Sequence, residues 1–389
     1  MIFPNLILNK KNWDFMVNAW EKNMIPNAII FHGTNGSGKE AHAIEYAALL
    51  NCNKIKNKHA CGNCFSCKKI KAFQHENIKL ILPLPRGKIR SNSDPEDKAF
   101  SDAILKEYLE KINLKKEDPY YSIHLTGSNT ILINSIRSLK STISLSTINN
   151  SWKIILIFNA EKLCIPSPEA AHSLLKILEE PPEKTLFILV TSNSNILLDT
   201  IHSRCQSIYF PPITTSIIEE KISQNSNNPI ESAIIARIAS GNMRMAIDLN
   251  TNAFNFIKKI LILIDSCFSN DPEKWSKSVN LISKLKLKNY NLMEQMLNSL
   301  ILFFRDLLYF SNTGLEDNII FRNNIDKIKN ICKTYIDADW DACIMHIEYT
   351  QLYISKNGYL PIQITCMFLD IQQSIQGKKC NPSRIIDWN

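Results

Sequence analysis

The stretch His32-Gly33-Thr34-Asn35-Gly36-Ser37-Gly38-Lys39-Glu40 decides the fold of this 389-residue chain. It matches the phosphate-binding pattern G-x-x-x-x-G-K-[ST] except at the last position, where Glu40 replaces Ser or Thr. In this pattern the glycines let backbone N–H groups surround phosphate oxygens, the lysine neutralises the outer phosphates, and the hydroxyl holds Mg²⁺. A carboxylate cannot take over from the hydroxyl, because phosphate oxygens repel it. The loop is therefore either a relic or a weak site for ATP or ADP, with Gly33, Gly36, Gly38 and Lys39 as its contacts and no Mg²⁺ site.

The residues on either side of the loop have the required character. Residues 29–31 form a short apolar run that is typical of a buried strand, and residues 41–50 are rich in Ala and Leu, which favour a helix. A strand, a Gly-rich turn and a helix in this order form the usual setting of a phosphate-binding loop. The alternative, a surface turn that matches the pattern by chance, lacks this setting.

Composition and charge set only broad limits. With 45% hydrophobic and 21% charged residues, the chain is ordinary for a soluble globular protein, and its length suggests two or three domains. No apolar stretch approaches the roughly 18–20 residues that span a bilayer, and the N-terminus lacks the pattern of a signal peptide. We therefore expect a cytoplasmic protein without a membrane partner. The net charge of +8 is compatible with contact to nucleic acid but does not establish it.

Four of the 11 cysteines lie close together, in the spacing C-x8-C-x2-C-x2-C. Four thiolates in a tight loop suit tetrahedral Zn²⁺ in a closed structural site. A ferredoxin-type iron–sulfur cluster would need another cysteine shortly after Cys67, which the sequence lacks, and free thiols are the remaining alternative. We therefore predict a structural zinc ion in a loop at residues 52–67, bound by Cys52, Cys61, Cys64 and Cys67.

A second position that handles Mg²⁺ in P-loop ATPases is also changed. Residues 152–158 form an apolar run typical of a buried parallel strand. In P-loop ATPases this strand ends in an Asp that helps to hold Mg²⁺, but here it ends in Phe158 and Asn159. Since the positions of Glu40 and Phe158 both lack the residue type that handles Mg²⁺, we predict that this chain does not hydrolyse ATP by itself.

Strands and helices continue to alternate after this strand. Apolar periodicity predicts a helix at residues 170–178, which Pro181 and Pro182 stop, and a further apolar run predicts a strand at residues 186–190. This alternation is typical of a parallel sheet with helices on both faces. The predicted fold class is therefore α/β.

The motifs in this region resemble a known family. The run L-L-K-x-L-E-E-P-P at residues 174–182, the strand after it and the triplet Ser203-Arg204-Cys205 resemble the bacterial DNA polymerase III clamp loader, an AAA+ assembly. That family shares a four-cysteine loop inserted soon after the P-loop. Its motor subunits (gamma/tau) keep an intact P-loop and an Asp-Glu after the second strand, whereas its delta-prime subunits have lost both and keep Ser-Arg-Cys. The chain resembles the delta-prime group over roughly residues 1–75 and 150–250.

The resemblance implies roles for particular residues. The arginine of Ser-Arg-Cys reaches the ATP site of a neighbouring subunit in this family, which implies that Arg204 is an arginine finger supplied in trans. Arg244, in the run Gly241-Asn242-Met243-Arg244, resembles a lid arginine that contacts bound nucleotide. Thr191 and Ser192 follow a strand where such proteins sense the γ-phosphate, a role we do not expect here without Mg²⁺ ligands. On the sequence alone, either arginine is equally a solvated surface residue.

The chain divides into three expected parts. Residues 1–211 would form an AAA+ nucleotide-binding-type α/β domain, ending at the helix-breaking pair Pro211-Pro212. Residues 212–252 would form a helical lid and residues 253–389 an all-α collar domain, through which clamp-loader subunits form a ring.

Residues 83–130 depart from the short family pattern. Their Pro and Gly content and mixed charge predict an exposed insertion with a helix near residues 99–112, and we assign it no role. Three basic residues in it are expected to be solvated rather than to contact DNA: Arg86, Lys88 and Arg90.

Three functions remain in view. The sequence favours a non-hydrolysing clamp-loader subunit whose partners are gamma/tau, delta and, through the complex, the sliding clamp and primed DNA. The first alternative is an ATP-hydrolysing motor subunit, which would need Mg²⁺ ligands that the sequence does not show. The second is a zinc-dependent DNA-binding protein unrelated to ring assembly.

Overall fold

The computed structural model describes residues 1–389 except 145–150, 225–228, 252, 289, 357 and 379–389. The chain divides into two compact units: Met1–Ile213 with Gly241–Arg244, and Thr214–Ser240 with Met245–Asn389. The expected lid and collar fall mostly in the second unit, and both ranges include positions outside the described residues. The boundary between lid and collar therefore stays a prediction.

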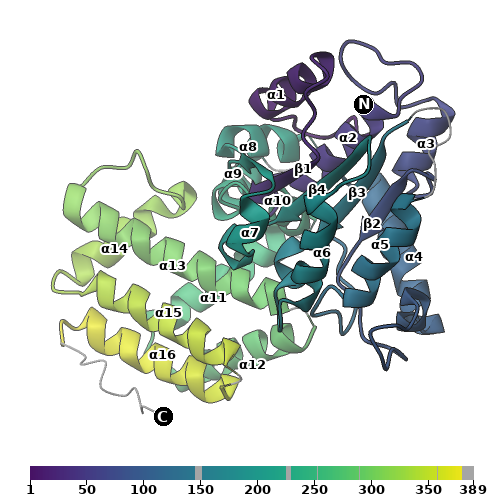
Figure 1. The fold of residues 1–389 in the computed structure, drawn as a ribbon. Coiled ribbons are helices and arrows are strands. Elements are labelled where there is room, and N and C mark those ends of the chain that lie inside the picture. The colour runs from purple at the N-terminus through teal and green to yellow at the C-terminus, as the bar shows by residue number, and fades with distance from the viewer. Residues whose placement is uncertain (145–150, 225–228, 252, 289, 357, 379–389) are drawn as a thin grey trace. The chain divides into compact units, whose positions relative to one another are not determined.

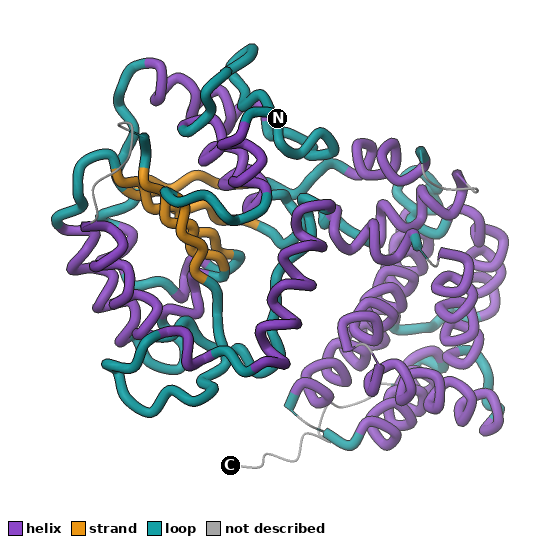
Figure 2. Tube along the Cα trace, turned by 90° about the vertical axis from the view of Figure 1, so that its right-hand side faces the viewer, coloured by secondary structure: helices purple, strands orange, loops and turns teal. Residues whose placement is uncertain are grey.

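A parallel sheet forms the centre of the first unit, with its strands in orange in Figure 2. All its pairings are parallel, in the order β2-β3-β4-β1-β5. The three apolar runs that we expected to be strands are therefore β1, β3 and β4, which lie side by side with their carboxyl ends at one edge. The strands are β1 (Ala28–Gly33), β2 (Ile78–Ile81), β3 (Lys153–Phe158), β4 (Thr185–Thr191) and β5 (Gln206–Phe210).

Helices cover both faces of this sheet (Figure 1). On one face, Ile30 and Leu189 of the sheet pack in a buried cluster with Leu139 of α5 (Ile133–Ser144) and Leu174 of α6 (Glu169–Glu179). Because successive side chains of a strand point to opposite faces, residues such as Phe31 face the other layer, where α2 (Lys39–Leu50) lies against β1, β3 and β4. The expected α/β class is confirmed. The other helices and 3₁₀ turns of this unit are α1 (Lys10–Glu21), α3 (Phe65–Lys71), η1 (Glu96–Ala99), α4 (Asp102–Glu117), η3 (Ala160–Leu163), η4 (Ser194–Ile196) and α7 (Asp199–His202).

Much of the insertion at residues 83–130 is exposed, as expected, but part of it packs in a small buried core. Its helix α4 begins later than expected, because Ser101 caps it by accepting a hydrogen bond from the backbone N–H of Ile104 at 3.4 Å. The three basic residues Arg86, Lys88 and Arg90 are exposed, as predicted. The buried core consists of Leu84, Ile89, Ala99, Leu125 and Leu132.

Helices make up the regular structure in the described part of the second unit. The long helix α13 packs against α11, α14 and α15, and its Phe303 and Phe304 are fully buried. The apolar periodicity at residues 293–304 therefore marks a core face. No described helix is long and apolar enough to span a bilayer. The helices are α8 (Thr215–Ser223), α9 (Pro229–Ile238), α10 (Met243–Asn250), α11 (Ala253–Cys267), α12 (Pro272–Lys288), α13 (Tyr290–Thr313), η5 (Arg322–Asn324), α14 (Ile325–Thr334), α15 (Trp340–Ser355) and α16 (Leu360–Ile375).

Candidate functional site

The turn between β1 and α2 has the backbone shape of a phosphate-binding loop. Gly36 and Gly38 have φ angles of 70° and 83°, in the left-handed region that glycine adopts without strain. At Gly33 an added Cβ would lie 2.1 Å from the backbone oxygen of Phe210, so β5 leaves no room for a side chain. Gly38 is also the N-cap of α2, where free N–H groups and the helix dipole favour an anion.

Lys39 lies inside this loop rather than in solvent. Its Nζ donates hydrogen bonds to the backbone oxygens of Gly33 at 2.8 Å and Thr34 at 2.6 Å, and it reaches Ser192 Oγ at 3.4 Å. Burial lowers the pKa of Lys39 to about 8, against the opposing effect of the Glu40 and Glu161 carboxylates. The Ser37 Oγ nearby is buried without a hydrogen-bond partner among the described residues, so a bound phosphate would satisfy it.

Glu40 forms an ion pair with a buried lysine of the insertion. Its Oε2 lies 2.6 Å from Nζ of Lys115, whose side chain is only 1% exposed. The same ammonium donates to the backbone oxygens of Pro119 at 3.0 Å and Tyr121 at 2.6 Å, so its three N–H groups all have acceptors. Sequence reasoning missed Lys115, because a lysine on a mixed-charge helix is ordinarily solvated.

Replacing Lys115 by methionine is expected to lower the free energy of unfolding by about 3–5 kcal/mol, because it leaves the largely buried Glu40 carboxylate unpaired. Denaturant unfolding of the wild type, K115M, E40Q and the double variant E40Q/K115M measures this. The double variant removes both charges, so its cost should be clearly smaller than the sum of the two single costs. Additive costs would show that the two side chains do not interact.

β3 ends at Phe158, at the position where P-loop ATPases carry an acidic Mg²⁺ ligand. Phe158 is fully buried, and its ring centroid lies 5.9 Å from Nζ of Lys115. The nearest acid along the chain, Glu161, instead accepts a hydrogen bond from Thr191 Oγ1 at 2.6 Å. Glu161 also acts electrostatically on Lys39, which sequence reasoning did not anticipate.

The run that contains Arg244 lies against the same loop. The motif's Asn242 approaches Gly36, where an added Cβ would lie 1.8 Å from Asn242 Oδ1, and the backbone N–H of Met243 donates to the Gly36 oxygen at 3.2 Å. Arg244 itself pairs with Asp118, and its guanidinium lies 4.9 Å from the ring centroid of Tyr121. Both of these partners are residues of the insertion.

His42, a further residue that the sequence did not single out, joins the loop to the N-terminal segment. Its Nε2 accepts a hydrogen bond from the backbone N–H of Asn9 at 2.9 Å, and its Nδ1 donates to the Gly38 oxygen at 2.8 Å. This arrangement requires the neutral imidazole. Burial lowers the pKa of His42 to about 4, although the bond to Gly38 opposes the shift.

Acidification should therefore weaken the fold through His42. Because its folded-state pKa lies below the unfolded value of 6.5, its contribution is complete above pH 6.5 and is lost as the pH falls towards about 4. A shift of this size corresponds to on the order of 3 kcal/mol. Denaturant unfolding at pH 7 and pH 4.5 should show a smaller loss for His42→Gln than for the wild type. An equal loss in both proteins would contradict this account.

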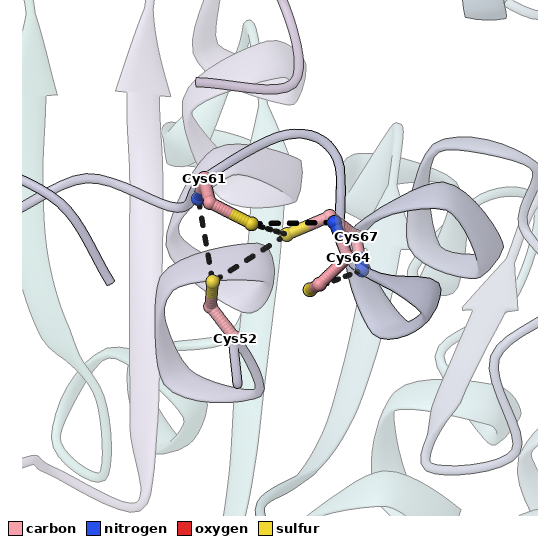
Figure 3. Close-up of side chains that lie close together, drawn as sticks. All are labelled: Cys52, Cys61, Cys64 and Cys67. Carbon is pink, nitrogen blue, oxygen red and sulfur yellow. Dashed lines mark hydrogen bonds between the residues drawn. The ribbon is translucent and has the colours of Figure 1, made fainter. Parts of the chain in front are cut away.

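The four clustered cysteines come together as a metal-ligand set (Figure 3). Their Sγ atoms all lie within 4.8 Å of one another. Cys67 Sγ is 3.6 Å from Cys52 Sγ and 3.9 Å from Cys61 Sγ, close to the edge of about 3.8 Å that a tetrahedron with Zn–S bonds of about 2.3 Å would have. All four are free thiols in the structure. The residues present therefore fit a closed zinc site.

The surroundings of these thiols shift their pKa values in different directions. Backbone N–H groups of Cys64 and Asn63 lower the pKa of Cys61 to about 6, because they stabilise the thiolate. Burial raises the pKa of Cys67. A bound Zn²⁺ would deprotonate every ligand regardless of these differences.

Arg204 lies at a partly exposed position just after α7. Its guanidinium donates to Glu179 Oε1 at 2.8 Å and to the Thr200 oxygen at 3.0 Å. The side chains of Arg204 and Glu179 are 34% and 52% exposed, so this ion pair contributes little to stability. The next residue, Cys205, packs against the core of the sheet and anchors the turn.

Comparison with known proteins finds similar sequences among subunits of DNA polymerase III. The family model described as DNA polymerase III, delta subunit, matches residues 8–214. The delta' subunit of Bacillus subtilis DNA polymerase III is 25% identical over 81% of this chain and 81% of its own length. The tau subunit from the same organism is 27% identical over 77% of this chain and 48% of its own length. A crystal structure of a gamma subunit-related protein from Thermotoga maritima covers 93% of this chain and 99% of its own, with 14% identity and a TM-score of 0.44.

The parallel sheet with a P-loop after β1 and the helical region that follows define a P-loop protein of the AAA+ class. The chain belongs to the DNA polymerase III delta subunit family, which confirms the clamp-loader family expected from its motifs.

Proposed function

We propose that this chain is a delta-prime-like subunit of the replicative clamp loader, which does not hydrolyse ATP itself and supplies Arg204 to the ATP site of a neighbouring subunit. The observation that carries the proposal is the pairing of Glu40 with Lys115, which commits the Mg²⁺-ligand position of the loop to an internal ion pair. The loss of an acid at Phe158 supports it. Without a Mg²⁺ ligand at either position, the chain lacks the means to neutralise the charge that develops during phosphoryl transfer.

Arg204 suits the part of an arginine finger. A guanidinium held by one exposed ion pair is available to a phosphate of another subunit, where it stabilises charge on the transferred phosphoryl group. The implied partners are gamma/tau and delta subunits and, through the complex, the sliding clamp and primed DNA. A cytoplasmic location and a ring-forming collar at residues 253–389 belong to the same proposal.

The second candidate is a hydrolysing motor subunit of the gamma/tau kind, which the similarity to the tau subunit of Bacillus subtilis favours. The two candidates differ in the activity of the lone chain. The purified chain is expected to show no ATPase above background and to co-elute with gamma/tau and delta subunits in size-exclusion chromatography. ATP turnover by the lone chain would show that it is a hydrolysing motor subunit. Strong DNA binding without co-elution would instead favour a zinc-dependent DNA-binding protein.

We further propose that Cys52, Cys61, Cys64 and Cys67 hold one structural Zn²⁺ ion. Their Sγ separations and the absence of disulfides among them support this. Because all four ligand positions are filled by the protein, the ion would have no open position for catalysis and would serve the fold alone.

A further inference from the structure

The insertion carries a buried cation to the position where P-loop proteins hold Mg²⁺. Glu40 replaces the hydroxyl that would contact the metal, and Lys115 Nζ lies 2.6 Å from its carboxylate. Phe158 replaces the acid that would contact the metal from β3, and its ring centroid lies 5.9 Å from the same Nζ. One ammonium group thus lies near both positions that have lost their Mg²⁺-handling side chains.

The ammonium sits in a complete ligand shell. Besides Glu40, the backbone oxygens of Pro119 and Tyr121 accept its remaining hydrogen bonds, so the chain after α4 turns around it. A lysine with 1% exposure is tolerated only when its charge is paired and its donors are satisfied, and both conditions are met here. A bound Mg²⁺ takes carboxylate and other oxygen ligands in the same manner.

The segment that holds this ammonium, residues 115–121, also contacts other parts of the loop site. Asp118 and Tyr121 both contact Arg244. Tyr120 is buried, accepts a hydrogen bond from the backbone N–H of Ile7 at 2.8 Å, and would lie 3.3 Å from a Cβ added at Gly38. Residues that would contact a nucleotide are therefore already engaged by one segment of the same chain.

We propose that Lys115 is a built-in replacement for the divalent cation, and that it excludes metal–nucleotide complexes from this loop. An ammonium 2.6 Å from Glu40 occupies the metal's place and repels a second cation from it. Any nucleotide that the loop accepts is then held without a metal, by Lys39 and the backbone N–H groups at the start of α2. This inference is independent of the role of Arg204.

Binding of the Mn²⁺–ADP complex, followed by electron paramagnetic resonance and calorimetry, tests the proposal. The variants are Glu40→Thr, which restores the loop hydroxyl but leaves Lys115, and the double variant E40T/K115M, which also removes the ammonium. We expect no metal-dependent ADP binding by the wild type or by E40T, and a gain of at least tenfold in affinity for Mn²⁺–ADP by the double variant. Metal-dependent binding by the wild type, an equal gain in E40T, or no gain in a folded double variant would overturn the proposal.

A measurement on the wild-type chain does not depend on the folding of variants. Because Lys115 is 1% exposed, its amine should resist acetylation by acetic anhydride, while exposed lysines such as Lys88 react. Mass spectrometry should find Lys115 equally protected with and without millimolar Mg²⁺–ATP. If Mg²⁺–ATP makes Lys115 reactive, the metal–nucleotide complex displaces it and the proposal fails.

Discussion

Replacing Arg204 by alanine is expected to remove most of the DNA- and clamp-stimulated ATPase rate of a reconstituted clamp loader. At the ATP site that Arg204 would contact in the proposed function, the loss should be about 10³-fold or more, the effect of an arginine finger in other systems. The physical reason is that a planar guanidinium offers two parallel N–H donors to the oxygens of the transferred phosphoryl group. Steady-state ATPase assays of the complex with wild-type or variant chain measure the loss.

Two further variants separate this role from a structural one. Arg204→Lys keeps the charge but not the planar pair of donors, so it should recover only part of the rate. Glu179→Gln removes the carboxylate that pairs with Arg204 and should leave both stability and stimulated rate nearly unchanged, because the ion pair is partly exposed. If an intact complex with R204A kept the full stimulated ATPase rate, Arg204 would not be an arginine finger. ATP turnover by the lone chain would point to a motor subunit.

Removal of the proposed zinc ion should have the largest effect on stability. Structural zinc sites in small peptides bind with apparent free energies on the order of 10 kcal/mol, most of which is spent on folding the loop. Cys67 is the fully buried member of the proposed ligand set, so Cys67→Ala should abolish zinc binding and unfold residues 52–67. Metal analysis should find about one zinc per wild-type chain and none in the variant, and thermal unfolding should begin at a lower temperature.

A matched control is available in a cysteine outside the cluster. Cys164 is a free thiol near the core of the sheet and far along the chain from the four ligands, so C164A should keep its zinc. A chelator should destabilise the wild type and C164A but not C67A. A wild-type protein that is fully folded without any metal would rule out the zinc site.

The elements closest to the loop could be predicted because their signals are local. Residues 29–31, 152–158 and 186–190 are apolar runs, and they form β1, β3 and β4. The clustered cysteines are separated by a few residues, so their spacing alone brought them together. In each case the structure depends on residues that are close together in the sequence.

The long-range ion pairs at the loop, those of Glu40 and Arg244, could not be predicted in this way. Lys115 pairs with Glu40, 75 residues away in the sequence, and nothing in the mixed charge of α4 distinguishes it from an exposed lysine such as Lys106. The surroundings of Lys115 include Glu40 of α2 and Phe158 of β3, which are distant in the sequence, so no sequence period signals its burial. The ion pair between Arg244 and Asp118 is likewise a contact between residues far apart in the sequence, and no local pattern indicated it.

The ion pair between Arg204 and Glu179 also has a consequence for how the chain would respond to its neighbours. Both side chains are partly exposed, so salt at physiological concentration screens the pair, and breaking it costs at most about 1 kcal/mol. The guanidinium can therefore leave its carboxylate by a change of side-chain rotamer, while Cys205 keeps the backbone of the turn in place. Arg204 would then reach a phosphate of a neighbouring subunit on the fast timescale of side-chain motion. In the proposed complex, the slower step would be the closure of the ring of subunits and not the movement of this side chain.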